Sequence, residues 1–157
     1  MKISLGPRTV ETAAVYFERS HSPFIRKMLP QKAQTPEEAL ADFRASQEPG
    51  ASSFGRTVWA DGRYVGDVWC YCMDPDGDPQ AMVSYCIFEQ VLWSRGAATE
   101  ALGMFLEEIR ERFTLTRIGA FTYMENAGSI RVLEKNGFRL QESFTEDGVE
   151  SRYYLRT

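Results

Sequence analysis

Apolar residues follow two patterns along the chain, and each pattern predicts one type of secondary structure. Short apolar or alternating runs predict strands, and these lie at 1–5, 54–60, 64–72, 80–88, 117–123, 138–144 and 149–155. Apolar residues at helical spacing predict helices, which run from 9 or 11 to 19, over 22–29, from 35 to Pro49, over 98–113 and over 126–136. Asp-Gly pairs at 61–62 and 147–148 predict hairpin turns. This order predicts an α+β fold, with helices covering a mixed sheet.

The same spacing predicts which helix faces are buried. In the long helix the inward face consists of Ala98, Ala101, Leu102, Phe105, Ile109 and Phe113. In the first helix it consists of Val10, Ala14 and Phe17. Both sets recur at three or four residues, the spacing that places side chains on one helix face.

The joint between the strand at 80–88 and the long helix predicts a phosphate site. The segment 93–98 reads WSRGAA, and its small residues let backbone N–H groups approach a ligand closely. The helix start adds unpaired donors and the positive end of the helix dipole. The segment lacks the lysine and hydroxyl of a P-loop and the three glycines of the dinucleotide fingerprint, so another phosphate-bearing ligand is indicated.

A second segment, 125–139, reads ENAGSIRVLEKNGFR and predicts a short helix with well-defined ends. Asn126 is a favourable N-cap, and Ser129 falls at the third helical position. Ile130 and Leu133 share a face, and Gly137 predicts a left-handed C-cap.

Together, the two segments resemble the GCN5-related N-acetyltransferase (GNAT) family. The family's pyrophosphate loop reads Q/R-x-x-G-x-G/A, and the matching positions here are Trp93, Gly96 and Ala98. Its later helix reads N-x-x-S/A-x-x-x-L/Y-x-x-x-G-F, and the matching positions are Asn126, Ser129, Leu133, Gly137 and Phe138. Trp93 departs from the usual Gln or Arg. The segment 129–138 is most similar to the branch that modifies ribosomal-protein N-termini.

The resemblance implies a fold, an activity and a cosubstrate. The fold is a single domain over 1–157 with a mostly antiparallel sheet of about seven strands. The activity is transfer of an acetyl group from acetyl-CoA to a primary amine by direct attack, without a metal. The amine belongs to a small molecule or to a peptide or protein N-terminus.

The resemblance also implies which residues bind coenzyme A. The pantetheine arm lies beside the strand at 80–88 like an added strand, the pyrophosphate lies on the amides of the glycine-containing loop, and the second helix contacts the arm near the sulfur. The implied residues are Cys86, Ile87, Phe88, Trp93, Ser94, Arg95, Gly96, Ala97, Ala98, Thr99, Asn126 and Ser129.

Two catalytic roles follow from the resemblance. Ser129, or a water that it holds, would protonate the departing thiolate; the plain alternative is a polar residue at a helix start. The tyrosine that serves as the acid in many relatives is replaced by Leu133. An amine also needs a proton acceptor at neutral pH, and the strand-end Glu89 is the first candidate. Other candidates are Glu125, Asp67, Tyr85, a carboxylate of the substrate, and water.

Composition and net charge exclude several other classes of function and site. A net charge of −4 argues against sequence-independent nucleic-acid binding and favours cationic partners such as amines. Neither a long apolar run nor a secretory signal is present, so a cytoplasmic protein is expected. Three cysteines, an odd number, argue against a disulfide framework, and Cys70 and Cys72 are expected to point the same way from one strand. One histidine and no CxxC leave no set of zinc ligands.

Two alternatives to an enzyme stay open at this point. The first is a non-catalytic acyl-CoA-binding domain, favoured by the missing tyrosine and the missing strand carboxylate and disfavoured by the Asn126 and Ser129 pair. The second is a structural or interaction domain that does not respond to coenzyme A. The oligomeric state is predicted to be a monomer or a homodimer.

Overall fold

A computed structural model describes residues 1–74 and 76–157, so Pro75 of the predicted 74–79 connector lies outside the described residues. Seven strands form one sheet in the order β1-β2-β3-β4-β5-β7-β6, antiparallel except between β4 and β5. The strands are β1 (Ile3–Pro7), β2 (Phe54–Ala60), β3 (Arg63–Tyr71), β4 (Gln80–Ile87), β5 (Arg117–Tyr123), β6 (Arg139–Glu146) and β7 (Val149–Arg156). The predicted mixed, mostly antiparallel α+β sheet is confirmed.

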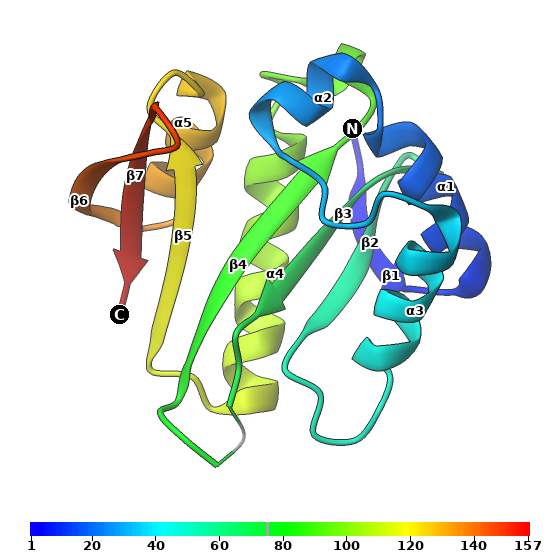
Figure 1. Ribbon diagram of the computed structural model, residues 1–157, viewed down its shortest axis with the longest axis horizontal. Helices are drawn as coiled ribbons and strands as arrows, with labels where there is room; N and C mark the ends of the chain where they lie inside the picture. Colours follow the sequence, from blue (N-terminus) through cyan, green and yellow to red (C-terminus); the bar gives the residue numbers. More distant parts are fainter. Residues whose placement is uncertain (75) are drawn as a thin grey trace.

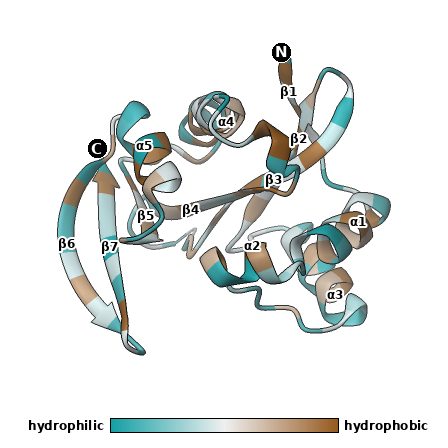
Figure 2. Cartoon of the chain, turned by 90° about the horizontal axis from the view of Figure 1, so that it is seen from above, coloured by the Kyte–Doolittle hydropathy of each residue, from teal (hydrophilic) through white to brown (hydrophobic). Residues whose placement is uncertain are grey.

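Helices cover both faces of this sheet (Figures 1 and 2). The helices are α1 (Val10–Ser20), α2 (Pro23–Met28), α3 (Pro36–Ser46), the short 3₁₀ helix η1 (Gln90–Leu92), α4 (Ala97–Phe113) and α5 (Ala127–Lys135). The view from above shows α4 and α5 on one side of the sheet and α1 to α3 on the other. Within the described residues, no helix combines the length and apolarity needed to cross a membrane.

The long helix α4 is anchored in the main core. Ala101, Leu102, Phe105 and Ile109 are buried to 1% exposure or less, as the spacing predicts. They pack with the inward side chains of the central strands in one hydrophobic cluster. Apolar burial therefore fixes α4, and with it the loop at its N-terminus.

Two predictions about buried side chains are wrong. In α1, Val10 and Ala14 are exposed, whereas Tyr16 packs on the sheet against Trp69 of β3, with ring centroids 5.9 Å apart. The reason is that α1 contacts the sheet through an aromatic side chain rather than through the small apolar stripe. Cys72 is exposed with a φ of 58°, because β3 ends at Tyr71. It does not share a face with the buried Cys70.

The sheet opens between its two central strands. β4 and β5 pair only over Gln80–Met82 with Arg117–Gly119, at the start of both strands. Beyond this point β4 pairs only with β3, while β5 pairs with β7 along its length. One edge of the upper half of β4 is therefore unpaired, and Figure 1 shows β4 and β5 diverging there.

Candidate active site

A cavity of about 460 Å³ occupies the opening between β4 and β5. It is bounded by α2 on one side and by the N-terminal ends of α4 and α5 on the other. Most residues predicted to bind coenzyme A line it: Cys86, Ile87, Trp93, Ser94, Gly96, Ala97, Ala98, Thr99, Asn126 and Ser129. Phe88, Arg95 and Glu89 do not line it.

The unpaired edge of β4 presents main-chain groups to this cavity. The amide of Phe88 donates to the carbonyl of Val65 in β3, with N and O 2.9 Å apart. Since successive strand residues direct their backbone groups to opposite sides, Ile87 and Tyr85 direct theirs to the open edge. The Trp93 indole confirms this direction, because its Nε1–H donates to the Ile87 carbonyl at 2.7 Å.

This geometry corrects the predicted strand contacts. The Phe88 amide is already bonded to β3, and the Phe88 side chain is buried in the cluster under α1 and α2. The Cys86 carbonyl lies against Gly66 of β3, where an added Cβ would collide with it. Of the three residues predicted to pair with the pantetheine arm, only Ile87 offers backbone groups to the cavity. Tyr85 is the second such residue, a role that the sequence motifs did not predict.

The start of α4 supplies unpaired donors to the same cavity. Gly96 is the N-cap with a φ of 88°, and the first intrahelical bond is formed by Glu100. Among the α-helices of the described residues, only α4 lacks a side-chain N-cap; the others are capped by Thr9, Ser22, Thr35 and Asn126. Amides at such an end attract anions. Arg131 and Lys135 add positive charge to the cavity lining, whereas Arg95 is exposed and lies outside it.

The start of α5 places a hydroxyl pair at the cavity. Asn126 caps the helix as predicted, its Oδ1 accepting from the Ser129 amide at 3.1 Å. The Ser129 Oγ lies 2.7 Å from the hydroxyl of Tyr85, and the Ser129 carbonyl, 3.2 Å from the same hydroxyl, is a second acceptor within reach of the phenol proton. Burial raises the pKa of Tyr85, and its hydrogen bond with Ser129 offsets part of that rise. Leu133 is 1% exposed and belongs to the core.

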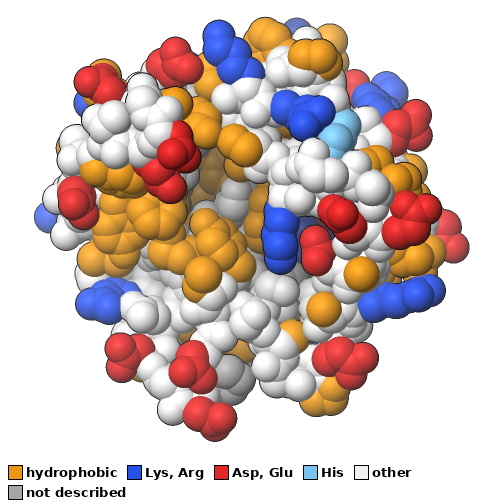
Figure 3. All heavy atoms as spheres, in the orientation of Figure 1, with side chains coloured by type: hydrophobic (Ala, Val, Ile, Leu, Met, Phe, Trp, Pro, Cys, Tyr) orange, Lys and Arg blue, Asp and Glu red, His pale blue; other side chains and the backbone are white. Residues whose placement is uncertain are grey.

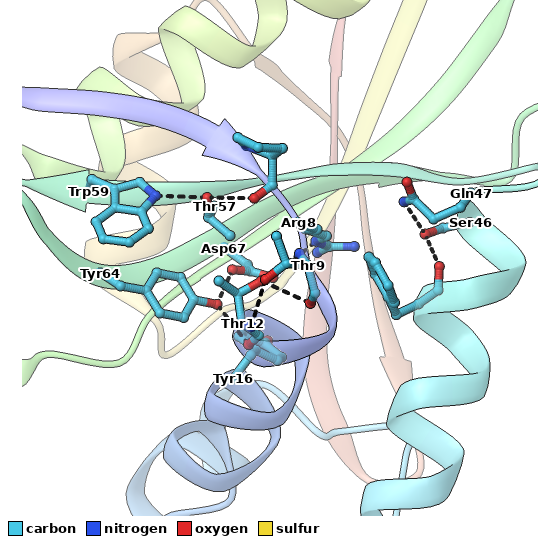
Figure 4. Close-up of polar contacts among 12 residues, drawn as sticks. Arg8, Thr9, Thr12, Tyr16, Ser46, Gln47, Thr57, Trp59, Tyr64 and Asp67 are labelled. Carbon is cyan, nitrogen blue, oxygen red and sulfur yellow. Dashed lines mark hydrogen bonds and ion pairs between the residues drawn. The ribbon is translucent and has the colours of Figure 1, made fainter.

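The carboxylates predicted as general bases lie in different environments. Glu89 forms an ion pair with Arg19 of α1 and is not part of the cavity lining. Asp67 is buried between β3 and α1, where Tyr64 and Arg8 both donate to it (Figure 4). Burial raises the pKa of Asp67 to about 6, although Arg8 and Tyr64 act in the opposite direction. Among these candidate carboxylates, Glu125 is the one that lines the cavity.

Apolar side chains from α2 and β5 also line the cavity. Ile25, Met28 and Leu29 line it from α2 and the residue that follows, and Phe121 lines it from β5. Figure 3 shows a hollow on this face with hydrophobic side chains gathered over β5 to β7. No motif in the sequence pointed to these four residues individually. The alternation in β5, with Ile118 and Ala120 buried and Phe121 exposed, was the available signal for Phe121.

Comparison with known proteins identifies the family. The model of the acetyltransferase (GNAT) domain matches residues 3–139, so the chain belongs to the GNAT acetyltransferase family. The resemblance stated from the two sequence segments is therefore confirmed. No match was found among curated protein sequences.

Solved structures share the fold at low sequence identity. The ribosomal L7/L12 α-N-protein acetyltransferase RimL in complex with coenzyme A is 14% identical with a TM-score of 0.84, covering 99% of this chain and 94% of its own. The aminoglycoside acetyltransferase AAC(6')-Ib with coenzyme A is 18% identical with a TM-score of 0.82, covering 99% and 95%. Mycobacterium smegmatis RimJ with coenzyme A disulfide is 20% identical with a TM-score of 0.80, covering 99% and 81%.

Proposed function

We propose that this protein is an acetyl-CoA-dependent N-acetyltransferase that modifies a primary amine of a small molecule or of a peptide or protein N-terminus. The observation that carries the proposal is the meeting of two main-chain surfaces at one cavity. The open edge of β4 and the uncapped start of α4 both direct backbone groups into it. An extended arm ending in phosphates satisfies both surfaces at once.

The chain's residues fit coenzyme A in three places. Ile87 and Tyr85 offer strand-edge groups to an extended arm. The amides from Gly96 to Thr99 face a pyrophosphate. Arg131 and Lys135 supply the positive charge that phosphates attract.

Bound acetyl-CoA would supply an acetyl thioester. The new N–C bond would form and the C–S bond would break, the amine would lose one proton, and the leaving sulfur would gain one from solvent. Glu125 accepts the proton of the amine, directly or through water, because it is the candidate carboxylate at the cavity. Ser129 donates a hydrogen bond to the sulfur as negative charge develops on it. Burial keeps Tyr85 protonated, so Tyr85 does not act as the base.

The acceptor end of the cavity favours one amine on an apolar body. Among the described residues that line the cavity, Glu125 is the only carboxylate, and the lining also includes the apolar side chains of Ile25, Met28, Leu29 and Phe121. A polycation needs several carboxylates to replace its hydration, and the nearby Glu89 and Asp67 are already paired. We therefore favour a peptide N-terminus or an arylalkylamine over an aminoglycoside such as kanamycin, a ligand in one of the AAC(6')-Ib structures.

Two measurements test the proposal. Coenzyme A and acetyl-CoA are expected to raise the melting temperature, since a ligand that binds only the native state stabilises it, and NAD is expected to do much less. Thiol release from acetyl-CoA is then followed with dipeptides carrying an apolar first residue, with phenethylamine and with kanamycin. Turnover with the first two and little with kanamycin is expected. An unchanged melting temperature at millimolar coenzyme A would refute the proposal.

One observation favours a second candidate, a non-catalytic acyl-CoA-binding domain. The position of the family's tyrosine acid holds Leu133, which is buried in the core. A clear thermal shift without thiol release for any acceptor in the panel would support this candidate. A single domain, a monomer or homodimer, a cytoplasmic location and the absence of a nucleic-acid or membrane partner remain predictions from the sequence.

A further inference from the structure

The hydroxyl of Tyr85 bridges the opening between the central strands. β4 and β5 stop pairing after Met82 and Gly119, and Tyr85 lies three residues further along β4. Its side chain reaches α5, the helix that follows β5, and bonds to Ser129. Among the described residues, the two contacts of Tyr85 with Ser129, to its Oγ and to its carbonyl, are the only side-chain hydrogen bonds between the unpaired part of β4 and α5.

The direction of this bond decides where the Ser129 proton points. A tyrosine hydroxyl has one proton, and a serine hydroxyl has one proton and two acceptor sites. When Tyr85 donates to Ser129 Oγ, the serine proton is released for a partner in the cavity. When Tyr85 donates to the Ser129 carbonyl, the serine donates to Tyr85 instead, and its proton is directed away from the cavity. Ser129 Oγ lies 2.7 Å from the Tyr85 hydroxyl, at the centre of the range for two hydroxyls, whereas the Ser129 carbonyl lies 3.2 Å away, beyond the range of about 2.5–3.0 Å for an O–H donor. The shorter contact favours donation of the phenol proton to Ser129 Oγ.

We propose that Tyr85 is a positioning residue for acetyl transfer: its hydroxyl donates to Ser129 and thereby directs the serine proton to the leaving sulfur. This inference rests on the proposed function. Ser129 donates a hydrogen bond to the sulfur as the C–S bond breaks, and no proton leaves Tyr85. The proton that finally reaches the sulfur comes from solvent, and the amine proton goes to Glu125 or water, so the proton count balances.

The surroundings of Tyr85 suit a permanent donor. The side chain packs against the main core, and burial raises the pKa of Tyr85. The phenol therefore stays protonated over the pH range in which an acetyltransferase is assayed. A phenol that keeps its proton is able to donate to Ser129 at every such pH. This pair also places a polar group close to where the tyrosine acid is missing, since Leu133 follows Ser129 by one helical turn.

The test is a double-mutant cycle on turnover. Tyr85→Phe removes only the hydroxyl, Ser129→Ala removes the group that it orients, and the third variant combines both changes. Tyr71→Phe, which removes a phenol hydroxyl elsewhere in the sheet, is the matched control. For each protein, kcat, KM, the dissociation constant of coenzyme A and the melting temperature are measured with an active acceptor.

The proposal gives a definite pattern. Tyr85→Phe lowers kcat about three- to tenfold, leaves the dissociation constant of coenzyme A within twofold, and does not change the pH dependence of kcat/KM. In the Ser129→Ala background the same change has no further effect on kcat. Tyr71→Phe leaves kcat at the wild-type value. A Tyr85 that serves only stability would lower the melting temperature and leave the kcat of folded protein unchanged.

Two results overturn the proposal, and they are distinguishable from a failure of the function itself. The positioning role fails if Tyr85→Phe keeps the wild-type kcat in an active enzyme. It also fails if the losses from Tyr85→Phe and Ser129→Ala multiply in the double variant. A wild-type protein that binds coenzyme A without turning over any acceptor overturns the enzyme proposal together with this one.

Discussion

The two sides of the cavity differ in the groups that line them: main-chain groups on one side and side chains on the other. The coenzyme side consists of main-chain groups on β4 and α4, and α4 buries six residues in the core. The acceptor side is lined by side chains of α2, which belongs to the helix layer of α1 to α3. In this layer α3 has no buried residue, α2 buries only Ile25 and α1 buries only Ser20. The first side is fixed by apolar burial, and the second is held by aromatic contacts and polar bonds.

This difference has a physical consequence for specificity. Backbone amides at a helix start bind anionic groups, and most side-chain substitutions leave these amides in place. The coenzyme side therefore suits an invariant cosubstrate. Side chains on half-buried helices are replaced at low cost in stability, so the acceptor side suits a changing substrate. The predictions below test this contrast, starting with the largest expected effect.

Glu125→Gln is expected to lower kcat/KM by about 10²-fold or more, because a general base contributes about that factor. The affinity for coenzyme A is expected to stay unchanged. Glu89→Gln is the matched control, since Glu89 is paired with Arg19 and does not line the cavity. It is expected to change kcat/KM less than threefold. The reverse ranking of the two variants would return the role of base to Glu89 and place the acceptor nearer to α1.

Gly96→Val is expected to weaken coenzyme A binding about 10- to 100-fold, because amides that bond to charged oxygens contribute about 1.5–3 kcal/mol each. Gly96 has a φ of 88° with no atom within 4 Å of an added Cβ, and Gly148 has a φ of 78° with equally open surroundings. Both valines therefore cost about 1–2 kcal/mol of backbone strain, whereas Gly148→Val leaves affinity intact. Equal affinities by calorimetry would show that the phosphates bind elsewhere.

The coenzyme side could be predicted largely from local sequence. Asn126 and Gly137 end α5 as their residue types require, with the N-cap bond formed and a φ of 83° at Gly137. Gly96 caps α4 with a positive φ. Each of these features depends on a few neighbouring residues, and helix ends are coded locally.

The contacts that decide the chemistry were not predictable in this way. Glu89 pairs with Arg19, which is 70 positions away in the sequence, and Tyr85 bonds to Ser129, which is 44 positions away. No periodicity relates such pairs. Whether the Phe88 amide faces β3 or the cavity depends on the register of the β3 and β4 ladder, and a shift of one residue would reverse it.

Asp67→Asn is expected to remove a pH dependence of stability. The pKa of Asp67 is raised to about 6 in the folded protein, above its ordinary value of about 3.9. The folded state therefore binds more protons between these values, and the free energy of unfolding falls as pH rises from about 4 to about 6. The fall amounts to about 2–3 kcal/mol for this group. Denaturant melts at several pH values measure it, and an identical slope in wild type and Asp67→Asn would contradict the assignment.

Trp93→Phe is expected to have the smallest effect and to raise the affinity for coenzyme A. In the present structure the Trp93 indole donates to the Ile87 carbonyl, at the edge where an extended arm must pair. Phenylalanine keeps an aromatic ring beside Phe24, whose centroid lies 5.1 Å from that of Trp93, but it cannot donate. Loss of one competing hydrogen bond of about 0.5–1.5 kcal/mol corresponds to a dissociation constant about two- to tenfold lower.

The matched control is Trp59→Phe, which loses an indole bond to Thr57 Oγ1 of 2.8 Å on β2. Trp59 lies outside the cavity lining, so its replacement is expected to leave the affinity for coenzyme A unchanged. Weaker binding by Trp93→Phe would mean that the indole itself holds the cosubstrate. In that case the coenzyme side would depend on a side chain at the position where Trp93 replaces the family's usual Gln or Arg, and the contrast between the two sides of the cavity would narrow accordingly.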